Sequence, residues 1–107
     1  MSVVVSFIKP KGVGALGAPG IGSCRAQEVL SLTQTSTGSS ADGEVIVVAN
    51  NETTMILVAF GTAPDAQATA ETASTSAGIP IPAGQVGVTI AAPIGSKINV
   101  KDRKSVV

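Results

Sequence analysis

Three glycines, Gly12, Gly14 and Gly17, reproduce the G-x-G-x-x-G spacing of dinucleotide-binding loops. In such loops the glycines let the backbone approach a pyrophosphate, which the N-terminus of the following helix then binds. Here an A-P-G run follows in place of a helical pattern, and 107 residues leave no room for a complete dinucleotide domain. We therefore predict that these glycines belong to an extended arm and that the protein uses no cofactor.

Cys24 is the only thiol in the chain. A nucleophilic cysteine or serine is ordinarily activated by a histidine, and the sequence contains none. The neighbouring Arg25 could favour the thiolate, but it cannot accept a proton. A single cysteine also excludes an intrachain disulfide. We expect Cys24 to be a buried structural thiol; a Ser–Lys arrangement stays open, although no spacing points to one.

The carboxylates are scattered rather than clustered. Their spacing does not match a calcium-binding loop, and a glycosidase pair would have to come from distant positions. Carbohydrate sites usually stack sugars on aromatic rings, and the chain has no Trp or Tyr. We expect solvated turn and surface carboxylates, no metal site and no enzymatic activity, with a small hydrolase as the minor alternative. The seven are Glu28, Asp42, Glu44, Glu52, Asp65, Glu71 and Asp102.

The overall charge excludes several classes of partner. Seven basic and seven acidic residues give a net charge of zero, so no basic field attracts nucleic acid or anionic lipid. No apolar run approaches 18 residues, and residues 1–8 lack the basic start of a signal peptide. Only 13% of residues are charged, against a usual ~25%. This scarcity of charge favours a protein whose surface is partly covered by other subunits, in an oligomer or as a coat component. A monomer with a weakly charged, association-prone surface is the alternative.

The strongest secondary-structure signal covers residues 44–59. Two runs rich in Val and Ile flank the Asn50-Asn51 pair, and adjacent asparagines suit a tight turn, so we predict a β-hairpin. Both arms are continuously apolar. We therefore expect each to be covered on both faces, by a second sheet on one side and by another subunit on the other. Val47, Ile56 and Val58 are the predicted core residues.

The rest of the chain contains short apolar segments separated by turn residues, at spacings near ten residues. This pattern predicts an all-β protein of six to seven short strands, an antiparallel sandwich or a jelly-roll-like fold. Residues 1–22 form an N-terminal strand and a glycine-rich arm, and residues 23–107 form a single β domain. Residues 66–76 fit either a loop or one short helix. The further strand candidates are residues 3–8, 24–32, 78–82, 86–90 and 97–101, and a helix is the alternative for residues 24–32.

Three motifs occur in a fixed order in the second half of the chain. An apolar run over residues 55–60 leads into G-T-A-P at 61–64, I-P-A-G follows at 81–84, and G-S-K-I-N-V closes at 95–100. In this order they resemble small virion proteins of tailed bacteriophages. The resemblance covers residues 55–100 and implies a capsid decoration (cement) protein. Such proteins are small, all-β and often trimeric on the capsid exterior.

The resemblance also implies a partner and a location. The partner is the major capsid protein, and the place is the virion exterior, after assembly in the host cytoplasm. For contact with the capsid or with other subunits we select Phe7, Ile8, Gly12, Gly14 and Gly17. Deleting residues 1–22 is then expected to abolish capsid binding and leave the fold intact. The alternative function is a receptor- or glycan-binding module of a tail fibre or spike.

Overall fold

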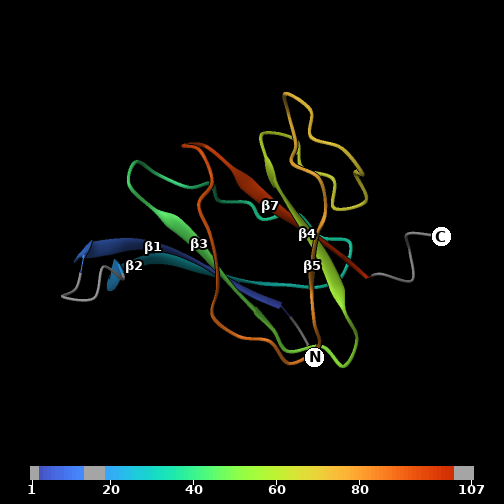
Figure 1. Cartoon of the computed structure of the whole chain (residues 1–107), viewed down its shortest axis with the longest axis horizontal. Coiled ribbons are helices and arrows are strands. Elements are labelled where there is room, and N and C mark those ends of the chain that lie inside the picture. Colours follow the sequence, from blue (N-terminus) through green and yellow to red (C-terminus); the bar gives the residue numbers. More distant parts are fainter. Residues whose placement is uncertain (1–2, 14–18, 103–107) are drawn as a thin grey trace.

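The computed structural model describes residues 3–13 and 19–102 and is all-β (Figure 1). Its seven strands form two antiparallel sheets, which confirms the predicted class. A jelly-roll topology, which needs eight strands, is not confirmed. The strands are β1 (Val3–Val13), β2 (Pro19–Leu30), β3 (Val45–Asn50), β4 (Ile56–Gly61), β5 (Ile79–Ile81), β6 (Val88–Ile90) and β7 (Lys97–Asp102).

The larger sheet has the strand order β2-β1-β3-β6. β1 lies in its middle, paired with β2 on one side and with β3 on the other. Side chains alternate between the two faces, so Val3, Val5 and Phe7 of β1 are fully buried. The expected domain boundary after residue 22 falls inside β2, and β1 packs into the same core as the rest of the chain.

The smaller sheet has the strand order β5-β4-β7. It contributes Ile56 and Val58 of β4, Ile81 of β5, and Ile98 and Val100 of β7 to the shared core. Residues 33–40 run beside the outer edge of β7 and bond to its backbone, with 2.7 Å from the Thr33 amide to the Val100 carbonyl. The core therefore lies between the two sheets.

Two expectations about β3 and β4 are wrong. Residues 44–59 do not form a hairpin, because β3 and β4 belong to different sheets. Val47 is half-buried on the face of β3 that points away from the core, whereas Ile56 and Val58 are core residues as predicted. Of the predicted glycine-rich arm, residues 12–13 lie at the end of β1 and residues 19–22 at the start of β2, and residues 14–18 lie outside the described residues.

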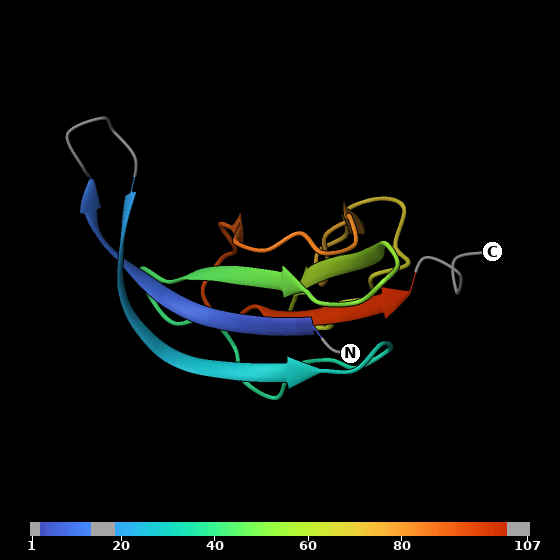
Figure 2. The ribbon, with the colours of Figure 1, turned by 90° about the horizontal axis from the view of Figure 1, so that it is seen from below.

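The β1–β2 hairpin is irregular towards its tip. The register passes from Ala26 to Cys24 and from Ser23 to Ile21, so Arg25 and Gly22 have no partner opposite them on β1. Such extra residues bend a strand and increase its twist. In Figure 2 the far ends of β1 and β2 curve away from the two sheets. Among residues 3–13 and 19–102, no helix follows Gly12 of β1, so the described chain does not supply the helix N-terminus that a dinucleotide-binding loop needs.

Candidate docking face

The face of the larger sheet that points away from the core carries no charged side chain among the described residues. We call it the outer face. Val29 is 64% exposed there, the highest value on this face among the large apolar residues. The face comprises Val4, Ser6 and Ile8 of β1, Cys24, Gln27 and Val29 of β2, Val45, Val47 and Ala49 of β3, and Thr89 of β6.

The strand registers place these residues in rows across the sheet. One row runs from Gln27 through Ser6 and Val47 to Thr89. Within it the Gln27 side-chain amide donates a 3.1 Å hydrogen bond to the Ser6 hydroxyl, which is nearly buried between its neighbours. Two of the polar groups on the face thus bind each other, which lowers the cost of removing them from water.

The outer surface of the smaller sheet is different, because residues 62–78 cover it. Ala66 is fully buried there, and its amide donates a 2.9 Å hydrogen bond to the side-chain oxygen of Asn99 on β7. The Ser76 amide bonds to the Phe60 carbonyl at 2.8 Å. Asn99 is therefore a buried polar residue. The chain thus covers the smaller sheet with its own loop. The larger sheet is not covered in this way: in Figure 2 its strands β1, β2 and β3 lie in front of the rest of the chain.

Two carboxylates hold the loop between β2 and β3 against the core side of β2. Arg25 donates to the Glu44 carboxylate at 2.7 Å and to the Ser39 carbonyl at 2.7 Å. The Glu44 side chain is only 4% exposed. The Glu28 carboxylate accepts hydrogen bonds from the Thr37 and Gly38 amides at 2.9 and 2.8 Å. These two carboxylates are structural, which corrects the expectation that all seven are solvated.

The same contacts shift two pKa values. The hydrogen bond from Arg25 holds the pKa of Glu44 below its usual value, against the opposing effect of burial. Burial alone would raise the pKa of Glu28, but the bonds from the Thr37 and Gly38 amides and the Thr37 hydroxyl outweigh it and lower that pKa. Both groups therefore favour the charged form in the folded protein.

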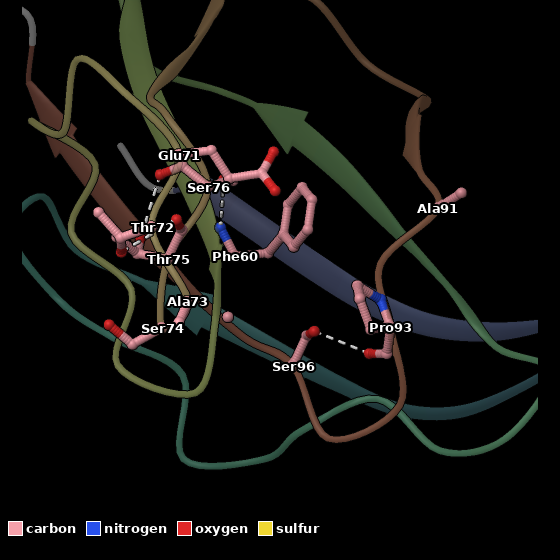
Figure 3. Close-up of a pocket in the computed structure, with 11 residues that line it drawn as sticks. Phe60, Glu71, Thr72, Ala73, Ser74, Thr75, Ser76, Ala91, Pro93 and Ser96 are labelled. Atoms are coloured by element: carbon pink, nitrogen blue, oxygen red, sulfur yellow. Dashed lines mark hydrogen bonds between the residues drawn. The ribbon is translucent and has the colours of Figure 1, made fainter.

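A groove of about 320 Å³ lies beside the end of β4, lined by Phe60, Glu71 and the loop 71–76 (Figure 3). Most of its hydroxyls are already used within the chain. Ser76 Oγ accepts from the Phe60 amide and donates to the Ala77 carbonyl, and Ser96 Oγ donates to the Pro93 carbonyl. No cluster of three metal-ligating side chains occurs among the described residues. The groove therefore offers little chemistry beyond the Glu71 carboxylate.

The structure separates the residues selected from the sequence. Phe7 is fully buried in the core, with the Arg25 guanidinium 5.5 Å from its ring centre, so it is not available to a partner. Ile8 lies on the outer face, half-buried. Gly12 lies on β1, and Gly14 and Gly17 lie outside the described residues.

Cys24 also differs from its expected position. It is exposed on the outer face rather than buried. Sequence reasoning missed Val4, Val29 and Ala49, although the alternation of side chains along β1 and β3 indicates that every second residue points away from the core.

Comparisons with protein-family models, with curated proteins and with solved structures found no match. None of the described segments forms a helix with the length and apolar character needed to cross a membrane.

Proposed function

We propose that this protein is a non-enzymatic structural component of a phage particle. It decorates the capsid exterior by binding the major capsid protein, in the manner of a cement protein. The observation that carries the proposal is the uncharged outer face of the larger sheet. The motif resemblance over residues 55–100 supports the same function.

The outer face suits the proposed docking on physical grounds. Apolar area removed from water contributes roughly 25 cal/mol per Å², less the cost of association. A charge buried in an interface without a partner would oppose this gain, and the described outer face has none. Val47 lies near the middle of the face, between Ser6 and Thr89, where a partner would exclude water most completely.

The number of copies is part of the same proposal. The resemblance implies a homotrimer on the capsid, assembled in the host cytoplasm.

A receptor- or glycan-binding module of a tail fibre or spike is the alternative. That function would use the groove beside Phe60, where the hydroxyls of Ser76 and Ser96 are already bonded within the chain. We therefore favour capsid decoration.

Binding to capsids that lack this protein tests the proposal. Val47→Lys places a charge at the middle of the outer face, whereas Val86→Lys places one on a loop residue that is 60% exposed. Co-sedimentation with capsids should fall at least tenfold for Val47→Lys, which corresponds to about 1.4 kcal/mol, and should not change for Val86→Lys. Circular dichroism checks that both variants fold. Equal binding by folded Val47→Lys and wild type would exclude the outer face as the capsid contact.

A further inference from the structure

The two sheets have four edges, and three of them are protected against pairing with another chain. β5 contains Pro80, which lacks an amide donor. β6 is only three residues long. β7 is bonded along its outer side to residues 33–40. Natural β proteins block their edges in these ways to prevent uncontrolled association.

The fourth edge, along β2, is open. β2 is twelve residues long and contains no proline after Pro19. Among the described residues, its backbone bonds to no strand other than β1, and one further bond, from the Cys24 thiol to the Ala26 carbonyl, stays within β2. The nearby loop reaches β2 through the side chains of Arg25 and Glu28, and a Cβ placed on Gly38 of that loop would lie 3.6 Å from the ring of core residue Phe7. The loop therefore lies on the core side of the sheet rather than along the edge.

We propose that the β2 edges of two copies of this protein pair antiparallel about a two-fold axis. The pairing joins two four-stranded sheets into one sheet of about eight strands. It also makes the two outer faces continuous, so the pair presents twice the uncharged surface of one copy.

Charge favours a second copy as the occupant. Arg25 and Glu28 are the only charged residues between positions 23 and 30. Arg25 is bound to Glu44, and Glu28 is bound to backbone amides. Pairing of two β2 edges about a two-fold axis therefore brings no unpaired like charges together. The side chains beside this edge on the outer face are those of Gln27 and Val29. An ionic partner would find no unpaired charge on this stretch.

The irregular register limits the length of the pairing. The regular part of β2, Ala26 to Leu30, comprises five register positions and spans about 17 Å at ~3.4 Å per residue. An interface of this length is small, so the association should depend on concentration in the micromolar to millimolar range. The inference does not rest on capsid binding, because the protein alone forms the pair. It differs from the homotrimer on the capsid that the motif resemblance implies, and the solution mass distinguishes the two.

The experiment combines solution mass with amide hydrogen exchange by NMR across that concentration range. The mass should rise from 10.5 kDa to twice that value. The β2 amides that do not bond to β1 should exchange fast in dilute protein and at least tenfold slower in concentrated protein. A monomer at all concentrations, a trimer, or a dimer in which these amides stay unprotected would each overturn the proposal.

Two matched variants complete the test. Val29→Lys places a charge beside the open edge, and Val86→Lys places one at similar exposure, 60% against 64%, away from it. Lysine at an edge strand opposes pairing, so Val29→Lys should weaken the dimer about tenfold, whereas Val86→Lys should match the wild type. Equal dimerisation of all three proteins would also overturn the proposal. Failure of Val47→Lys to lose capsid binding would overturn the proposed function alone.

Discussion

The side-chain amide of Asn50, at the end of β3, donates a 3.1 Å hydrogen bond to the carbonyl of Ile81 in β5, which joins the two sheets. The same amide donates to the Pro82 and Thr54 carbonyls at 2.9 and 3.2 Å. Its oxygen accepts from the Glu52 amide at 2.9 Å. Asn50 is fully buried, and its side chain contacts four backbone groups where the chain passes from one sheet to the other, with its two N–H groups shared among three carbonyls.

Asn50→Ala should therefore destabilise the protein strongly. The substitution leaves backbone groups near β5 without their partner, and we expect a loss of about 2–4 kcal/mol in the free energy of unfolding. Urea denaturation measures this loss. The neighbouring Asn51 is exposed, and Asn51→Ala should stay within about 0.5 kcal/mol of the wild type. Similar losses for the two variants would contradict the bridging role of Asn50.

Stability should fall in acid because of Glu28 and Glu44. Both carboxyls have a lowered pKa in the folded protein. Their contribution is complete above the usual glutamate pKa of about 4.3 and is lost as the pH falls through the lower folded values. Thermal unfolding between neutral pH and pH 3 measures the effect. The double variant Glu28→Gln, Glu44→Gln should be less stable at neutral pH and less sensitive to acid, while Glu71→Gln should follow the wild type.

Removing Phe7 should unfold or severely weaken the protein. Phe7 is fully buried, so Phe7→Ala should cost about 3–5 kcal/mol. Its neighbour Ile8 lies half-buried on the outer face, and Ile8→Ala should cost only about 1 kcal/mol. Deleting residues 1–22 removes the whole of β1 from the middle of the larger sheet and should abolish cooperative unfolding, in contrast to the sequence-based expectation. A folded deletion variant would show that β1 is dispensable.

The thiol of Cys24 should react readily in the native state. Because it is exposed on the outer face, a chromogenic disulfide reagent should modify it in dilute protein without denaturant. The rate should rise less than tenfold when urea unfolds the chain. A thiol that reacts only after unfolding would indicate the buried position expected from sequence.

Strand positions could be predicted from sequence more reliably than strand partners. Residues 45–49 and 55–60 contain enough Val and Ile to identify two strands, and β3 and β4 lie there. The predicted pairing of these two strands was wrong, because the sequence at Asn50 is typical of a tight turn. Its side chain in fact bonds to Thr54, Ile81 and Pro82, and two of these partners lie some thirty residues away. No local pattern contains that information.

The candidate docking face was predictable only in part. The scarcity of charge indicated a covered surface, and the apolar runs indicated two covered faces for β3. Which sheet keeps an uncovered face depends on where residues 62–78 fold, and Ala66 and Asn99, whose bond fixes that loop, are 33 residues apart. The glycines near residue 12 led to the prediction of an arm. Glycine-rich sequence is compatible with both flexible chain and irregular strands, so composition alone does not distinguish them.

The bonding of residues 33–40 to β7 has a consequence for synthesis on the ribosome. Ser36 and Ile98, whose groups bond across this edge, are separated by 62 residues. Residues 33–40 of the nascent chain are therefore exposed long before β7 is translated. Until then, Ile56 and Val58 of β4 also lack β7, the strand that completes the smaller sheet. Co-translational folding can complete the β1–β2 hairpin and its pairing with β3, but the sandwich closes only after the last strand has left the exit tunnel.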